Sequence, residues 1–141
     1  MKSASILTVS AIVSATAQQA WNTYTRPTSV MRWNKASDDW HCPNATNDLR
    51  VGGAFNYRME ACDGSVGFDF EGTFTDVQPY SVLRYSMGED RSVEVLFVEH
   101  EGQTTVSVSF TPDDVHPHEL QLSGWQAILN NFKLVAETEY V

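Results

Sequence analysis

The sequence is poor in cysteine and in basic residues, and both shortages exclude classes of protein. Its two cysteines, Cys42 and Cys62, are too few for a disulfide scaffold. Two reduced thiols are expected, with a single bridge as the open alternative. Nine Lys and Arg stand against eighteen Asp and Glu, which gives a net charge of −9. Binding to nucleic acid or to an anionic membrane through basic residues is therefore not expected.

Long apolar runs and linkers are also missing. No uninterrupted apolar run approaches the roughly 20 residues that cross a bilayer, so no membrane span is expected. No repeat, low-complexity stretch or Gly/Ser/Pro linker divides the chain, and apolar residues make up 42% of it. We therefore expect residues 1–141 to form a single domain with a core of its own.

The N-terminal segment has two interpretations. Lys2, the apolar stretch that follows it and the Ala15-Thr16-Ala17 site are typical of a signal peptide. Polar residues dilute that stretch at every second position, however, which favours a half-buried strand over residues 4–13. We prefer the strand and expect a cytoplasmic protein.

Helix signals stand at both ends of the chain. Thr16 with Gln19 forms a capping-box pattern that predicts a short helix over 17–24, and Pro27 then separates it from a second helical turn over 27–32. Near the C-terminus, apolar residues recur at spacings of three and four, which predicts a long amphipathic helix over 117–138.

Alternation of apolar and polar residues between turns predicts strands in the middle of the chain. The turns are Asp63-Gly64, Pro79-Tyr80-Ser81, Gly88-Glu89-Asp90 and Glu101-Gly102. The predicted fold class is α+β, with a curved antiparallel sheet of six to seven strands wrapped around the long C-terminal helix, and two short helices after the first strand.

Four segments of the chain match motifs that occur together in one protein family. Residues 18–27 with Trp33 resemble a "VWxAxTdPexlxxW" motif, and residues 48–55 resemble "DlrvGGxf". Residues 72–79 resemble "GxfxeixPp", and Gly124-Trp125 resembles "GW". In this order, the segments resemble the heat-shock-protein-90 ATPase activator homologue-like family of the START-like (SRPBCC) superfamily. The resemblance implies a helix-grip fold, in which sheet and long helix enclose a cavity. The true chaperone activator also carries a separate clamping domain, for which 141 residues leave no room.

Sixteen aromatic residues, 11% of the chain, are the strongest functional signal. One interpretation is that these aromatic side chains only form the hydrophobic core. With the helix-grip resemblance, a ligand cavity is the other, and its predicted lining is aromatic: Trp33, Phe55, Tyr57, Phe68, Phe70, Tyr85 and Trp125. The first 35 residues hold four bases and no acid, so Arg26 and Arg32 are predicted to form a basic entrance to the cavity.

Other candidate chemistry is weak. Asp113, His116 and His118 lack the spacing of a metal site and are expected at a solvated helix start. His41 and Cys42 are adjacent in the chain, which does not favour a nucleophile–base pair. A mid-helix Gly124 costs stability, and close backbone approach is one explanation for it. We predict no catalytic residue, no metal and no cofactor.

The sequence thus favours a binding module for a small apolar or amphipathic ligand, as a monomer or homodimer. An enzyme that uses the same cavity for cyclase- or hydrolase-like chemistry is the alternative, because the fold alone does not decide function. A stress-related, chaperone-associated interaction protein is the third interpretation.

Overall fold

A computed structural model describes residues 6–88 and 90–139, and its elements follow the predicted order. The helices are α1 (Ala17–Thr25), α2 (Pro27–Trp33) and α3 (His118–Glu139). The strands are β1 (Leu7–Val13), β2 (Trp40–Asn47), β3 (Ala54–Ala61), β4 (Gly67–Gln78), β5 (Val82–Ser86), β6 (Ser92–His100) and β7 (Gln103–Phe110). The predicted α+β fold is confirmed. The part of the predicted first strand at residues 4 and 5 lies outside the described residues.

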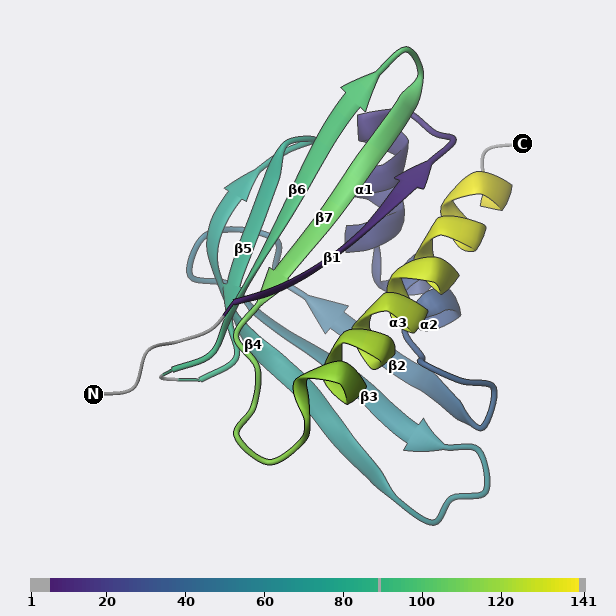
Figure 1. The fold of residues 1–141 in the computed structure, drawn as a ribbon, viewed down its shortest axis with the longest axis vertical. Coiled ribbons are helices and arrows are strands. Elements are labelled where there is room, and N and C mark those ends of the chain that lie inside the picture. Colours follow the sequence, from purple (N-terminus) through teal and green to yellow (C-terminus); the bar gives the residue numbers. More distant parts are fainter. Residues whose placement is uncertain (1–5, 89, 140–141) are drawn as a thin grey trace.

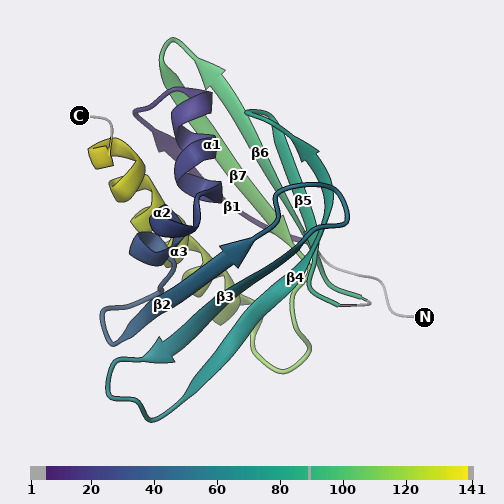
Figure 2. The ribbon, with the colours of Figure 1, turned by 180° about the vertical axis from the view of Figure 1, so that it is seen from behind.

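All seven strands form one antiparallel sheet in the order β1-β7-β6-β5-β4-β3-β2. The sheet curls around α3, and α1 and α2 lie beside that helix (Figures 1 and 2). Strands β2 to β7 lie in the order of the sequence, whereas β1 pairs with β7, so the first and last strands of the chain are neighbours. The concave face of the sheet and α3 therefore enclose the space where the apolar side chains meet.

The two short helices begin where the sequence predicts, and each ends one residue later than predicted. The Thr16 hydroxyl accepts the Gln19 backbone N–H at 3.1 Å, and the Gln19 side chain accepts the Thr16 N–H at 3.0 Å, so the capping box is formed. Pro27 stands in the first turn of α2, where its missing N–H costs no hydrogen bond.

β2 is the strand that the sequence patterns did not predict. It contains Pro43, which has no N–H to donate, and its register against β3 shifts between His41 and Asn44. A proline is tolerated here because β2 is an edge strand and the shift is a bulge-type irregularity.

The inner face of the sheet packs on one side of α3. Leu129, Phe132 and Ala136 are the buried apolar residues of that helix, and Phe132 is fully buried. Its ring lies 5.2 Å from that of Tyr24 on α1 and 5.5 Å from that of Trp33 on α2. Phe132 thus joins all three helices in one apolar cluster.

The Glu139 carboxylate connects the C-terminal end of α3 to the two short helices. Glu139 accepts hydrogen bonds from the hydroxyls of Thr23 (2.7 Å) and Ser29 (2.8 Å) and from the Arg32 guanidinium (2.9 Å). A negative charge is unfavourable at the negative end of the helix dipole. These three donors, from α1 and α2, offset that cost and fix both short helices against α3.

Within residues 6–88 and 90–139, no helix is both long and apolar enough to cross a membrane.

Candidate functional site

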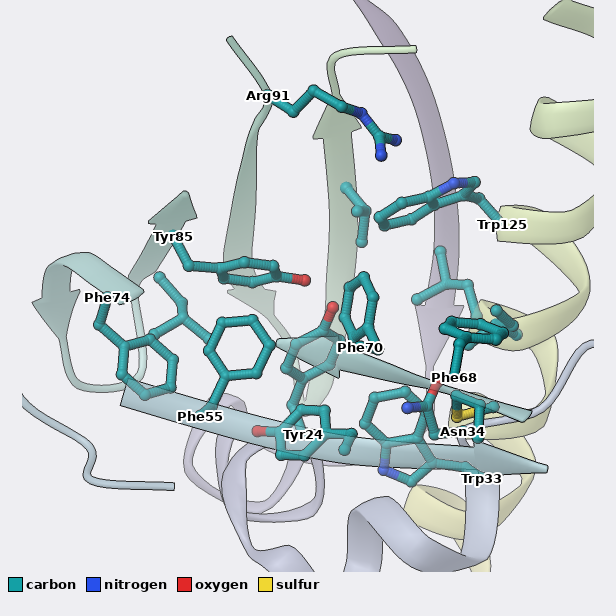
Figure 3. A pocket seen from close by; sticks show the side chains of 16 residues that line it. Tyr24, Trp33, Asn34, Phe55, Phe68, Phe70, Phe74, Tyr85, Arg91 and Trp125 are labelled. Carbon is teal, nitrogen blue, oxygen red and sulfur yellow. The ribbon is translucent and has the colours of Figure 1, made fainter. Parts of the chain in front are cut away.

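The structure contains a pocket of about 280 Å³ between the sheet and α3 (Figure 3). All seven residues predicted to line a cavity lie around it: Trp33, Phe55, Tyr57, Phe68, Phe70, Tyr85 and Trp125. Their part in binding a ligand stays a prediction. Nine further residues complete the lining: Tyr24, Asn34, Met59, Phe74, Leu83, Arg91, Val108, Ile128 and Leu129.

Phe55 is the centre of the aromatic wall. Its ring centroid lies 5.0 Å from those of Tyr57 and Tyr85, 5.3 Å from that of Phe74 and 5.7 Å from that of Phe70. It is paired across the strands with Gly72, where a Cβ atom would come within 2.9 Å of the Phe55 ring. The absence of a side chain at Gly72 therefore makes room for this ring.

The rim of the pocket is less buried than its wall. Phe68 is 51% exposed, and its ring meets that of Trp40 edge-on at 5.9 Å. Phe70 and Trp125 are half-buried, and their rings meet edge-on with the centroids 6.4 Å apart. These side chains come from β4 and α3, so the opening lies between the sheet and the N-terminal half of that helix.

Three tyrosine hydroxyls provide the polar groups at the buried end. Tyr24 and Tyr85 are hydrogen-bonded to each other, and Tyr57 accepts a hydrogen bond from the Asn47 side chain at 3.0 Å. Burial raises the pKa of Tyr24 to about 12 and raises the pKa values of Tyr57 and Tyr85 as well. All three phenols are therefore neutral near pH 7 and can exchange hydrogen bonds with a ligand.

Among the described residues that line the pocket, Arg91 is the single charged one, and sequence reasoning missed it. It stands between a turn and the start of β6, and its guanidinium points toward the Trp125 indole (Figure 3). Asn34, at the end of α2, was also missed and is 7% exposed. Neither residue belongs to a periodic apolar pattern, so no sequence signal pointed to either.

Arg26 and Arg32, which were predicted at the entrance to the cavity, are not among the residues that line this pocket. They line a second, shallow hollow with Thr28, Ser29 and Glu139. The helical turn of α2 explains the difference, because it buries Trp33 on the pocket side and leaves Arg32 exposed, paired with Glu139 at 2.9 Å.

The residues considered for a metal site or a nucleophile have structural roles or lie apart. Asp113 accepts the backbone N–H groups of Val115 (2.9 Å) and His116 (2.8 Å) ahead of α3, and these bonds help to lower its pKa to about 2. No cluster of three or more potential metal ligands occurs in the described part of the chain. Cys42 and Cys62 are both free thiols. His41 is exposed whereas Cys42 is buried, so the two side chains lie on opposite faces of β2.

Gly124 has no close neighbour that explains it. A Cβ atom built there meets nothing within 4 Å, so the expected close backbone approach is wrong.

Comparison with known proteins gives the family. The model of the family described as "Activator of Hsp90 ATPase homolog 1-like protein" matches residues 14–137. The chain belongs to this family. The family match confirms the relationship that the sequence motifs predicted, and the fold is that of the START-like superfamily.

Solved structures agree with this assignment. An AHSA1-like protein from Aeromonas hydrophila is 38% identical, with 95% of this chain and 94% of that chain covered and a TM-score of 0.85. Chr148 from Cytophaga hutchinsonii is 41% identical, with 94% and 92% covered and a TM-score of 0.80. A Nitrosomonas europaea protein, only 16% identical over 96% of each chain, shares the fold with a TM-score of 0.85. No curated protein matches the chain.

Proposed function

We propose that this chain, as one START-like domain, binds a small apolar or amphipathic molecule in the pocket between the sheet and α3. The observation that carries the proposal is the lining itself, a largely apolar wall with a few convergent polar groups and an open rim. Ligand sites in proteins have this composition and volumes of roughly 300–1,000 Å³, so a pocket of about 280 Å³ fits a small ligand. Covering apolar surface there contributes about 25 cal/mol per Å² before ordering costs.

The chemistry of the lining favours binding over catalysis. Within residues 6–88 and 90–139, no residue that lines the pocket carries a carboxylate, imidazole or thiol. The raised pKa values of Tyr24 and Tyr85 make both phenols poor proton donors and very rarely ionised near pH 7. Hydrogen bonding to a ligand oxygen or nitrogen is what these hydroxyls can do.

A neutral fluorescent probe tests the proposal. N-phenyl-1-naphthylamine brightens in apolar sites, and we expect saturable binding to the protein. Phe70→Asp places a carboxylate in the pocket wall and should weaken binding about tenfold or more, because a charge next to an apolar ligand loses solvation. Thr73→Asp, on an exposed position of the same strand, is the matched control and should bind normally.

The fold of both variants is checked by far-UV circular dichroism and thermal unfolding. The proposal fails if the wild-type protein does not bind the probe saturably. It also fails if a folded Phe70→Asp variant binds the probe as well as the wild type does.

A further inference from the structure

Apart from the Asn34 amide, which lies beside Trp33 and Phe68 (Figure 3), the polar side chains of the pocket lie at its two ends. The buried end carries the hydroxyls of Tyr24, Tyr57 and Tyr85, which are uncharged near pH 7. The rim carries Arg91, which is half-buried and positively charged (Figure 3). An apolar wall lies between them. A molecule that satisfied both ends would have a charged head, an apolar body and a neutral polar group at its far end.

The backbone holds Arg91 in place at the rim. Its carbonyl accepts the Met87 N–H at 2.9 Å across the β5–β6 turn, and the next residue, Ser92, accepts the Thr111 N–H at 3.0 Å. The side chain is directed by the Thr111 carbonyl, which accepts from Nε and Nη2 at 3.4 Å each. These two bonds are long and weak, and they engage only part of a group with five N–H donors.

The partners of Arg91 differ from those of most other described arginines. Arg32 pairs with Glu139, Arg50 with Asp48, Arg58 with Glu60 and Asp69, and Arg84 with Asp76 and Glu94. Within residues 6–88 and 90–139, no carboxylate forms an ion pair with Arg91. Its charge is therefore not neutralised by a described neighbour, and it faces a largely apolar space.

We infer that Arg91 binds the anionic head, a carboxylate or sulfonate, of an amphipathic ligand whose apolar body lies among Phe55, Phe70 and Trp125. The inference rests on the proposed function and adds the charge of the ligand to it. A guanidinium presents parallel N–H groups that match two oxygens of such a head. The chain as a whole carries a net charge of −9 and repels anions, so this selectivity arises from a contact at the rim.

The inference replaces the basic entrance predicted at Arg26 and Arg32. Both lie in the second hollow and not in the pocket lining, and Arg32 is neutralised by Glu139. Arg26 is exposed, which makes it a matched control for the loss of one positive charge without loss of a pocket contact.

Two probes with the same aromatic frame separate charge from apolar contact. 8-Anilinonaphthalene-1-sulfonate carries an anionic group, and N-phenyl-1-naphthylamine carries none. We expect both to bind the wild-type protein and to compete with each other. Arg91→Gln should weaken binding of the sulfonate about tenfold, as for the loss of a charge-assisted hydrogen bond, and should weaken binding of the neutral probe much less. Arg26→Gln should change neither affinity.

A second arm uses the unmodified protein, so that the test does not depend on the folding of one variant. Added salt should weaken the sulfonate and not the neutral probe, because it screens charges at the half-exposed rim. The inference is overturned if folded Arg91→Gln binds the sulfonate as well as the wild type does, or if it loses affinity for both probes equally. It is also overturned if Arg26→Gln weakens sulfonate binding more than Arg91→Gln does. Binding of the neutral probe alone also overturns it and leaves the proposed function standing. Binding of neither probe overturns both.

Discussion

The indole of Trp125 stacks on the ring of Phe110, with the centroids 4.2 Å apart and the planes 9° from parallel. Phe110 is the last residue of β7 and is fully buried, whereas Trp125 is half-buried and lines the pocket. This contact fixes the N-terminal half of α3 to the sheet beside the opening. One side chain of α3 thus stabilises the fold and forms the wall of the proposed binding site.

The stack predicts a double effect for Trp125→Leu. Loss of the ring contact and of part of the buried area should lower the free energy of unfolding by about 1–2 kcal/mol. The affinity for N-phenyl-1-naphthylamine should fall as well. Leu134→Ala, at a 61% exposed position of the same helix, is the control and should change neither quantity. Urea unfolding and probe titration measure the two effects, and an unchanged probe affinity in Trp125→Leu would contradict the assignment of this wall.

Gly124 and Gly72 predict opposite outcomes for the same substitution. Gly124→Ala should stabilise the protein by about 0.8–1.0 kcal/mol, because the new Cβ meets open space within α3 and alanine favours the helix. Gly72→Ala should destabilise it, because its Cβ would lie 2.1 Å from the Ser86 carbonyl oxygen. Thermal unfolding of the two variants tests both signs. A destabilised Gly124→Ala would show that the helix surface at this position is not open.

Glu139 predicts a graded response at the C-terminal end of α3. Glu139→Ala removes the carboxylate that accepts hydrogen bonds from Thr23, Ser29 and Arg32. The buried Thr23 hydroxyl then loses its acceptor, so the free energy of unfolding should fall by about 2 kcal/mol. Glu139→Gln keeps an acceptor oxygen and should lose less. Glu101→Ala, in an exposed turn, is the control. Equal stability of Glu139→Ala and the wild type, in urea unfolding, would rule out this clamp.

The buried tyrosines predict a loss of stability in alkali. The pKa of Tyr24 is about 12 in the folded chain against 10 for an ordinary tyrosine. Stability from such a group is fully present below pH 10 and is lost as the pH rises toward 12, because only the unfolded chain releases the proton easily. Tyr85, with its pKa also raised by burial, acts in the same direction.

The urea midpoint of the wild type should therefore fall steeply above pH 10. A Tyr24→Phe, Tyr85→Phe double variant removes both hydroxyls of the bonded pair together and should show a shallower fall. Parallel curves for the two proteins would mean that other groups cause the alkaline loss.

Local patterns were sufficient to predict most of the fold. The Thr16–Gln19 capping box, Pro27 and the apolar spacing of α3 each concern residues close in sequence, and all three predictions are confirmed. β2 was not predicted because Pro43 breaks its alternation, and only pairing with β3, at the edge of the sheet, makes the segment a strand. Pairing with a neighbouring strand leaves no signal within the residues of β2 themselves.

The pocket was predictable only for residues that share a strand face or a helix face. Phe55, Tyr57 and Tyr85 follow the alternation of their strands, so the inner face could be assigned. Arg91 belongs to no such pattern. Its side chain is positioned by a hydrogen bond to the carbonyl of Thr111, which follows β7 and is distant in the sequence. Arg26 and Arg32 line a different hollow, and net charge along the sequence could not indicate which side of the seven-residue helix α2 faces the pocket.

The most direct test of the central claim is a ¹H–¹⁵N correlation spectrum of the labelled protein, titrated with N-phenyl-1-naphthylamine. The account predicts saturable shift changes at the backbone amides of Phe55, Phe70 and Tyr85 and at the indole N–H of Trp125, with none for Ser107 on the outer face of β7. Absence of saturable shifts, or shifts confined to residues outside the pocket, would contradict the proposed binding site.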